Sequence, residues 1–488
     1  MCGSPTSNDF TNGVRFFNNS ADKLITCGNY NLSVWEYDAA HNKLRKEPVN
    51  LGNLSRVFNT VTVDANDEFA YAGSASGDIM KIALDRKLLR AQGPHKGLIE
   101  LGVTCLAMAP EGMVLVGGGN GVLSLVTSET VGAGKSPKVP VVGATKVGDG
   151  AITSMSVDWN SWDGTHCTLF LGLNNADMYR AVLKAGHGIV ATEIVQTAHT
   201  GKINALAFPY EYSDVFATAA AGEIRVWHLD TCRELLRIEV PNLECNAVCF
   251  TDDGKLIISG WSDGKIRAFG PQTGRSVWSI TDAHPKGVSA VACTSDSKYV
   301  ISGGRDGAVR VWSLGPESQT LIASMKEHKG AVNRIAVRYS ADDECVTAAA
   351  DGTCVVWDLT TMKRRLALQS NCDFKSVCYH PDDSQLVTVG SDRKITYWDT
   401  FDGQPIRVLD GSENHGMTSV ATDGQGTLMV VGAEDKQVKI FKYDEGIMTH
   451  VGTGHSGVVK QVLVAPDRTR IVSVGSDGGI LIWDAPQE

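Results

Sequence analysis

The sequence predicts an all-β fold, a β-propeller made of tandem four-stranded blades. One pattern recurs along it: an apolar strand, a turn centred on Asp, and a second strand ending in an aromatic residue, as in ISGGRDGAVRVW (301–312) and VSVGSDGGILIW (472–483). The clearest closing residues are 41 to 45 residues apart, which is the period of propeller blades. Asp-Gly pairs favour tight hairpins at the turns, and helical periodicity is nearly absent. Radial repetition suits such a chain because it protects sheet edges without crossover helices.

Eleven units can be counted by their closing residues, of which the first four are weaker matches to the pattern. The closing residues are Trp35, Ile82, Leu125, Tyr179, Trp227, Phe269, Trp312, Trp357, Trp398, Phe441 and Trp483. Leu125 and Tyr179 are 54 residues apart, a longer spacing than the others. Residues 129–150 are rich in Gly, Pro and Lys, so we expect an inserted, exposed loop there.

The composition argues against several classes of function. Apolar residues make up 43% and charged residues 20% of the 488, as in globular proteins. A net charge of −10 argues against nucleic-acid binding, and no apolar run is long enough to span a membrane. Twelve cysteines without CxxC pairs indicate reduced thiols in the cytoplasm. We expect no cofactor, no metal and no small-molecule substrate.

Several units carry the residues of a known repeat. Trp-Asp pairs close three of them, and a His precedes the first strand of several. In these features the chain resembles the WD-repeat family, in which a His, a Ser or Thr, an Asp and a Trp form one structural tetrad per repeat. The resemblance implies three complete tetrads: His284, Ser302, Asp306 and Trp312; His328, Thr347, Asp351 and Trp357; His455, Ser473, Asp477 and Trp483.

The polar tetrad residues are interpreted as a structural hydrogen-bond network that stabilises each blade, rather than as a catalytic site. Buried indole N–H, hydroxyl and imidazole groups each need a hydrogen-bond partner. A Ser, a His and an Asp could also form a hydrolase triad, but their recurrence once per blade argues against it. In the unit closed by Trp227, His199 is followed by Ala217 and Ala221 where Ser and Asp are expected, so we predict weaker bracing there.

Longer segments resemble axonemal WD-repeat proteins of motile cilia, among them SASGDIMKI (74–82), SDGKIRAFGPQTGR (262–275) and EGIMTHVGTGHSG (445–457). This resemblance implies two seven-bladed propellers in tandem, a place inside the B-tubule of doublet microtubules, and contacts with tubulin and other axonemal inner proteins. The resemblance implies fourteen repeat units, whereas eleven are found in this sequence. We therefore expect that the chain lacks three N-terminal blades. Eleven blades are too many for one ring. Residues 191–488 are therefore expected to form a complete seven-bladed propeller and residues 1–190 about four blades of an incomplete one.

Other motifs have simpler explanations than binding sites. GAGKS (132–136) lacks the first Gly of a phosphate-binding loop and is followed by Pro137. Some cysteines and acidic pairs could suggest metal sites, but small buried thiols and solvated turns explain them better. These residues are Cys245, Cys249, Cys372 and Cys378, and the pairs Asp252-Asp253, Asp342-Asp343 and Asp382-Asp383.

Candidate partner contacts are fewer. Trp261 lies two residues before the turn residue Asp263, and Arg305 lies next to Asp306; aromatic and Arg side chains are enriched at binding hot spots. Lys363-Arg364-Arg365 and a loop with Lys135, Lys138 and Lys146 could offer positive patches to acidic tubulin. Together these observations favour a non-catalytic scaffold that stabilises the B-tubule of cilia and flagella and supports motility. The alternative is a cytosolic WD-repeat adaptor, such as a ubiquitin-ligase substrate receptor or an actin regulator.

Overall fold

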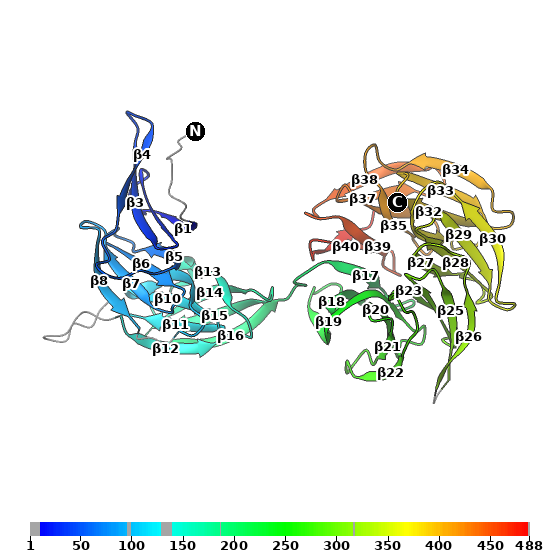
Figure 1. Cartoon of the computed structure of the whole chain (residues 1–488), viewed down its shortest axis with the longest axis horizontal. Helices are drawn as coiled ribbons and strands as arrows, with labels where there is room; N and C mark the ends of the chain where they lie inside the picture. Colours follow the sequence, from blue (N-terminus) through cyan, green and yellow to red (C-terminus); the bar gives the residue numbers. More distant parts are fainter. Residues whose placement is uncertain (1–9, 95–98, 128–138, 186, 316–317, 487–488) are drawn as a thin grey trace. The chain divides into compact units, whose positions relative to one another are not determined.

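The protein consists almost entirely of antiparallel strands, as the sequence predicts (Figure 1). The computed structural model describes residues 10–94, 99–127, 139–185, 187–315 and 318–486. Within them the helices are two short 3-10 turns, η1 (Pro110–Gly112) and η2 (Trp159–Ser161). None of the helices in these ranges could cross a bilayer. The chain divides into two compact units, Met1–Ala198 and His199–Glu488, and each is described by itself.

The first unit contains four sheets of four strands each, with the strands of each sheet in chain order. The first sheet is β1 (Thr11–Phe16), β2 (Lys23–Gly28), β3 (Asn31–Asp38) and β4 (Lys43–Pro48). The second is β5 (Phe58–Val63), β6 (Phe69–Ser74), β7 (Ile79–Ala83) and β8 (Leu88–Gly93). The third is β9 (Val103–Met108), β10 (Val114–Gly118), β11 (Val122–Val126) and β12 (Val141–Lys146). The fourth is β13 (Ile152–Asp158), β14 (His166–Leu173), β15 (Met178–Lys184) and β16 (Gly188–Gln196).

The second unit begins with one six-stranded sheet that holds two blades. Its strands are β17 (Ile203–Ala207), β18 (Val215–His228), β19 (Glu234–Phe250), β20 (Ile257–Trp261), β21 (Ile266–Phe269) and β22 (Ser276–Ile280). The 17-residue β19 pairs through one half with β18 and through the other with β20. It is therefore the outer strand of one blade and the inner strand of the next.

Five further sheets follow, each again in chain order. The first two are β23 (Val288–Cys293), β24 (Tyr299–Gly304), β25 (Val309–Leu314) and β26 (Gln319–Met325), then β27 (Val332–Val337), β28 (Glu344–Ala349), β29 (Thr353–Asp358) and β30 (Lys363–Gln369). The next two are β31 (Phe374–Tyr379), β32 (Gln385–Gly390), β33 (Lys394–Asp399) and β34 (Pro405–Asp410), then β35 (Met417–Thr422), β36 (Leu428–Ala433), β37 (Gln437–Lys442) and β38 (Ile447–Thr453). The last has three strands: β39 (Val459–Val464), β40 (Arg470–Gly475) and β41 (Ile480–Asp484).

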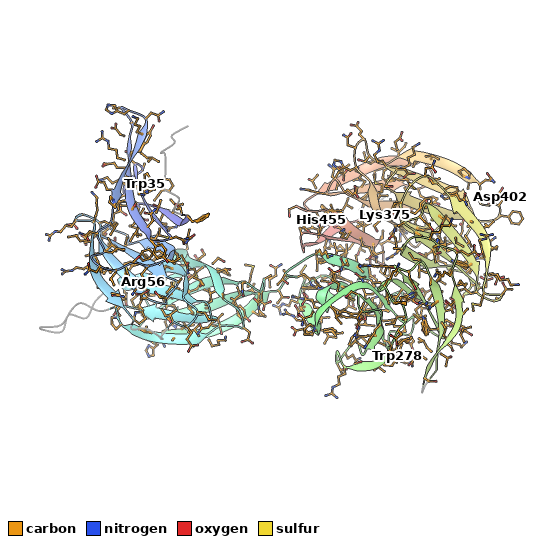
Figure 2. The ribbon with its side chains drawn as sticks, in the orientation of Figure 1. Trp35, Arg56, Trp278, Lys375, Asp402 and His455 are labelled. Carbon is orange, nitrogen blue, oxygen red and sulfur yellow. The ribbon has the colours of Figure 1, made fainter. Side chains whose placement is uncertain are left out.

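The inner strands of the second unit form a closed ring. They pack in the order β17, β19, β23, β27, β31, β35 and β39, and β39 packs against β17 again. Gln461 closes the ring, because its side-chain amide accepts from the Leu206 N–H at 3.0 Å and donates to the Leu206 carbonyl at 2.9 Å. Phe216 and Trp227 share a buried cluster with Val472 and Val474 at the same seam. Figure 2 shows Lys375 among the inner strands and Asp402 at the outer rim.

Two details of the sequence prediction are wrong in the first unit. In most blades the pairing of the third and fourth strands shifts register immediately before the closing residue, as at Val311/Trp312. The same shift precedes Val126, not Leu125, in the third blade, and in the fourth blade it occurs before both Tyr179 and Leu183. Val126 is not aromatic, so the sequence pattern is lost in the third blade.

The loop expected at 129–150 is also not a loop throughout. Strand β12 occupies part of it and completes the third blade, while residues 128–138, which include the GAGKS segment, Lys135 and Lys138, lie outside the described residues. Gly and Lys in this stretch are compatible with a fourth strand because its residues are exposed or only half-buried.

Candidate functional site

Each of the eleven inner strands contains a β-bulge at the same place. The bulged residue is the residue of the inner strand that has no partner on the second strand. A bulge of this kind turns the side chain away from its own sheet. The bulged residues are Asn12, Asn59, Thr104, Thr153, Asn204, Asn246, Ser289, Asn333, Lys375, Thr418 and Lys460. Nine of the eleven carry a short side chain with a hydrogen-bond donor.

In the second unit these donors link one blade to the next. Asn204 and Asn246 donate to the carbonyls of Cys245 and Val288, both at 2.9 Å. Ser289, Asn333 and Thr418 donate to Val332, Phe374 and Val459, each at 2.6 Å. Every acceptor is the backbone carbonyl just before the next bulged residue. The two remaining positions are Lys375, which pairs with Asp373, and the exposed Lys460.

The first unit shows the same links as far as its fourth blade. Asn12 donates to the Phe58 carbonyl at 2.8 Å and Asn59 to the Val103 carbonyl at 2.9 Å, and Thr104 donates to the Ile152 carbonyl. Thr153, in the fourth blade, is exposed and donates instead within its own blade, to the Gly172 carbonyl at 3.1 Å. The sequence analysis does not predict these links between blades. An Asn, Ser or Thr at the second or third position of an inner strand would have indicated them.

The structure brings the predicted tetrad residues together. In the blade closed by Trp312, its indole N–H donates to Ser302 Oγ at 2.9 Å, His284 Nε2 lies 2.9 Å from the same oxygen, and His284 Nδ1 lies 3.0 Å from Asp306 Oδ1. In the last blade Trp483 and His455 both lie 2.9 Å from Ser473 Oγ, and Asp477 lies 3.2 Å from His455 Nδ1.

The remaining predicted tetrad, in the blade closed by Trp357, includes Thr353 as an additional residue. Trp357 Nε1 donates to Thr347 Oγ1 at 2.8 Å, and His328 Nε2 lies 2.7 Å from it. His328 Nδ1, however, contacts Thr353 Oγ1 at 2.7 Å, and that hydroxyl donates to Asp351 Oδ1 at 2.6 Å. Asp351 Oδ1 is 3.7 Å from the imidazole. The carboxylate therefore reaches the imidazole mainly through a hydroxyl.

Protonation states fit this bracing. Burial is the main cause that lowers the pKa of His199, His284 and His328 below the usual 6.5. Burial alone would raise the pKa of Asp306, but the hydrogen bond and charge interaction with His284, the Ala308 N–H and the charge of Arg310 together outweigh it and leave that pKa below 3.8. A neutral imidazole beside a carboxylate donates through Nδ1 and accepts the hydroxyl proton at Nε2. All polar groups of the tetrad are then satisfied.

The blade closed by Trp227 has a complete tetrad, contrary to the prediction of weak bracing. His199 Nε2 lies 2.7 Å from Thr218 Oγ1, Trp227 Nε1 donates to that hydroxyl at 2.8 Å, and His199 Nδ1 lies 2.5 Å from Glu223 Oε1. The turn between the second and third strands is one residue shorter than in the Trp312 blade. The longer Glu side chain compensates for the displaced turn, so Ala217 and Ala221 are not the tetrad positions.

Trp261 is not a surface contact, which corrects its assignment as a candidate partner residue. It is 0% exposed and belongs to the core cluster between the first two blades of the second unit. Its position corresponds to Gly304 of the next blade, where any Cβ would lie 2.2 Å from His284 Nδ1. Trp261 thus fills the space of a tetrad His in a blade that lacks one, and its indole N–H donates to Ser259 Oγ at 2.8 Å.

The two remaining blades of the second unit lack a complete tetrad. Trp398 Nε1 donates to Thr388 Oγ1 at 2.7 Å, while the buried Cys372 lies near the place of the His. In the blade of β35–β38, Phe441 has no N–H to satisfy and Val431 replaces the hydroxyl residue. His415 is exposed there, and the buried Lys439 ammonium contacts Asp435 Oδ2 at 2.6 Å and the Gly411 carbonyl at 3.0 Å.

Among the remaining candidates, Arg305 is exposed and makes one contact of 3.3 Å with Asn246 Oδ1. The basic run on β30 is less available, because Arg364 pairs with Glu327 at 2.6 Å and Arg365 with Glu344 at 2.6 Å. Lys146 pairs with Asp149 at 3.4 Å. Among these cations, Arg364, Arg365 and Lys146 are thus held in ion pairs, whereas Arg305 is exposed.

The acidic pairs belong to the turns between inner and second strands, and some are not simply solvated. Asp342 accepts from the backbone N–H of Ser295 at 2.8 Å, and Asp383, which is 5% exposed, accepts from the N–H groups of Tyr339 and Ser340 at 3.0 and 2.9 Å. They tie neighbouring blades together. In the described ranges no cluster of His, Cys, Asp and Glu has a metal-binding arrangement.

The four cysteines singled out in the sequence are free thiols that are buried or partly buried. Burial raises the pKa of Cys372 to about 11 and that of Cys378 to about 12. Burial likewise raises the pKa of Cys245 and Cys249 well above the usual value. Thiols in this state are unreactive and pack as small apolar side chains.

Comparisons with known proteins agree with this architecture. The family described as WD domain, G-beta repeat, matches residues 238–269, 274–313, 319–358, 365–399, 403–442 and 447–484. The chain is 55% identical over 485 residues to cilia- and flagella-associated protein 52 of Chlamydomonas reinhardtii, covering 99% of this chain and 76% of that protein. It is 40% identical to the proteins of that name from Bos taurus and Homo sapiens, over 100% of this chain and 75% and 76% of theirs. The chain therefore belongs to the cilia- and flagella-associated protein 52 family of WD-repeat proteins.

Proposed function

We propose that this chain is a non-catalytic scaffold of the axoneme, a microtubule inner protein that stabilises the B-tubule of doublet microtubules and supports the motility of cilia and flagella. The observation that carries the proposal is the 55% identity over 99% of the chain to a cilia- and flagella-associated protein. Location in a cilium or flagellum follows from the family. The position inside the tubule and the tubulin contacts rest on the axonemal resemblance of the sequence.

The state of the polar residues supports a structural role rather than a catalytic one. Ser302 and His284 are both 0% exposed, and each of their polar atoms already has a partner inside the blade. A nucleophile and base would need to reach a substrate. The same constellation recurs in other blades, which suits repeated bracing of a rigid ring.

Docking on tubulin would have to depend on local contacts. Tubulin is acidic and this chain carries a net charge of −10, so long-range attraction opposes their association. Arg305 is a suitable local contact because it is exposed and lies in a turn between the second and third strands of its blade.

A tagged full chain expressed in ciliated cells that lack their own copy of the family member tests the proposal. We expect the tag inside the B-tubule in averaged tomograms of doublets, and retention on doublets after salt extraction. Arg305→Glu is expected to weaken retention. Lys298→Glu is the matched control, because it makes the same charge change at the other end of the same sheet, where the Lys298 side chain is 71% exposed.

A tag that stays in the cytoplasm, or that purifies with a ubiquitin ligase or with actin in place of doublets, would contradict the proposal and favour an adaptor. Equal retention of both charge variants would remove Arg305 from the interface without removing the scaffold role.

A further inference from the structure

The closed ring of the second unit encloses a central channel. Its wider part is a cavity of about 390 Å³ that residues from all the inner strands line. A narrower part, of about 70 Å³, lies among the bulged residues, including Lys375 (Figure 2). Pockets for small molecules commonly measure about 300–1,000 Å³, so the wider part is large enough for a ligand and the narrower part is not.

Arg334 is charged at a position that is otherwise neutral. It directly follows the bulged residue Asn333 on β27. Arg334 lines both parts of the channel, so its side chain lies where the channel narrows. The corresponding residues of the other inner strands in the ring are Ala205, Ala247, Ala290, Ser376, Ser419 and Gln461. Closure of the ring therefore does not require a cation at this position.

The guanidinium of Arg334 has no counter-charge in the described part of the chain. It makes neither an ion pair nor a hydrogen bond there. Burial is the main cause that lowers its pKa, and the groups that act in the opposite direction are the Cys378 thiol, the Tyr339 hydroxyl and the Cys249 thiol. None of these groups is a carboxylate. A cation that loses hydration without gaining a partner is costly, and a bound anion would remove that cost.

The wall around this guanidinium supplies no negative charge. Beyond Arg334 the inner strands line the cavity mostly with Val, Ile, Leu, Ala and Cys side chains. Burial raises the pKa of Cys378 to about 12 and that of Cys249 well above the usual value, so both thiols stay neutral. Arg338, which lines the same cavity, pairs with Asp383 at 3.4 Å. In apolar surroundings an anion beside Arg334 would be held more strongly than in water.

The wider part opens between the turns that join the inner strands to the second strands. Tyr210 and Tyr339 line this end and are both 58% exposed. Asp252 and Asp342 line it as well. Burial, followed by the Asp342 carboxylate, raises the pKa of Asp252 to about 6, so Asp252 is still mostly ionised at pH 7. The carboxylates repel ligands with several negative charges, whereas the tyrosines can contact an apolar or aromatic body. The opening thus favours a ligand with a single anionic group.

We propose that Arg334 is the recognition residue of a site for a small monocarboxylate in the channel of the second unit. A guanidinium donates parallel hydrogen bonds to the oxygens of a carboxylate, and the apolar body of the ligand would pack against the channel wall. The site goes beyond the proposed scaffold role and does not depend on it. It adds a ligand and no reaction, because the thiols that line the cavity are unreactive.

Benzoate is the probe, and benzamide is the control because it has nearly the same shape without the charge. Each is titrated into the full chain by calorimetry. We expect saturable binding of benzoate and a rise in Tm with benzoate concentration, since a ligand that binds the folded state alone stabilises it. Benzamide is expected to bind at least tenfold more weakly. Equal binding of the two compounds, or no binding of benzoate, would overturn the proposal.

Variants of the chain separate recognition from stability. Arg334→Met is expected to weaken benzoate binding at least tenfold and, without ligand, to raise Tm, because an apolar side chain replaces an unpaired cation. Arg334→Lys keeps the charge without the planar donors and is expected to bind benzoate with intermediate affinity. Arg275→Met, which makes the same change at an exposed residue before β22, is the matched control. Unchanged benzoate binding by Arg334→Met, or a lower Tm without ligand, would overturn the proposal, and the lower Tm would assign the guanidinium to the fold.

A capped peptide, acetyl-Ala-Glu-Ala-amide, tests whether a protein side chain is the ligand instead. We expect no binding of this peptide at concentrations at which benzoate saturates. Binding of the peptide in place of benzoate would overturn the small-molecule ligand and favour a protein segment. These measurements are independent of the axonemal test. Benzoate binding by a chain that never reaches the axoneme would remove only the proposed function, and doublet docking by a chain that binds no benzoate would remove only this inference.

Discussion

The indole nitrogen of Trp261 donates a hydrogen bond to Ser259 Oγ at 2.8 Å, in a blade whose closing residue, Phe269, has no N–H group in its side chain. The Ser of the tetrad is retained, but the Trp comes from the end of the second strand and occupies the space of the His. Arg267 covers the indole at 5.3 Å and pairs with Asp263 at 2.6 Å. The blade thus keeps its bracing with the residues rearranged.

Replacing this tryptophan is expected to be costly. Trp261→Ala removes a large, fully buried side chain and leaves Ser259 without its donor, so we expect a loss of about 3–5 kcal/mol in the free energy of unfolding. Trp278→Ala, which removes the same side chain from a partly exposed position on β22, should cost much less. Urea unfolding followed by circular dichroism measures both, and similar losses would refute the bracing role of Trp261.

The hydroxyl of Thr218 distinguishes the observed tetrad from the one predicted at Ala217. Thr218→Val keeps the shape but leaves Trp227 Nε1 and His199 Nε2 without a hydrogen-bond partner, at an expected cost of about 1–3 kcal/mol. Thr218→Ser keeps the hydroxyl and is expected to cost clearly less. The unfolding midpoints of the two variants in a denaturant titration measure this difference. Equal midpoints would mean that the hydroxyl contributes nothing to stability.

Acidification is expected to destabilise the second unit in two stages. His199, His284 and His328 have folded pKa values below 6.5, so the unfolded state binds more protons as the pH falls below about 6.5, and stability decreases there. Asp306 and Asp351 have folded pKa values below 3.8, so their contribution is present above that value and is lost at lower pH.

Thermal unfolding between pH 8 and pH 5 tests the first stage. A variant with His284→Gln and His328→Gln should show a smaller decrease in Tm over this range than the parent chain. An unchanged slope would show that these imidazoles do not titrate differently in the folded and unfolded states.

The ring of inter-blade hydrogen bonds suggests a stabilising substitution. Lys460→Asn places a short donor at the bulge between the last and first blades, where the neighbouring blades use Asn, Ser or Thr. A new hydrogen bond there is expected to add about 0.5–1.5 kcal/mol. Lys460→Ala, which removes the charge without adding a donor, is the control, and an equal Tm for the two variants would argue against the link.

The first unit is expected to be the less stable one. Its end strands leave Val14 and Phe16 on β1 59% exposed and Ile194 on β16 52% exposed, whereas β17 and β39 cover each other in the second unit. Limited proteolysis should therefore cut within residues 10–198 before it cuts within 199–486. Earlier cleavage in the second unit would contradict this expectation.

Sequence alone was sufficient for the fold class and the repeat period, because strand alternation, Asp-centred turns and closing Trp residues are local features. It failed at Val126, where a closing aromatic residue is absent, and at Thr218, where a turn is one residue shorter. It also failed at Trp261, since the same residue type suits a surface contact and a buried brace.

Only the tertiary structure decided which blades are joined and where the ring closes. The Asn333 amide donates to the carbonyl of Phe374, 41 residues away, and Gln461 bonds to Leu206, 255 residues away. Any residue type can present such a backbone carbonyl, so the sequence carries no mark of the acceptor. Strand register and the stacking of blades bring these atoms together.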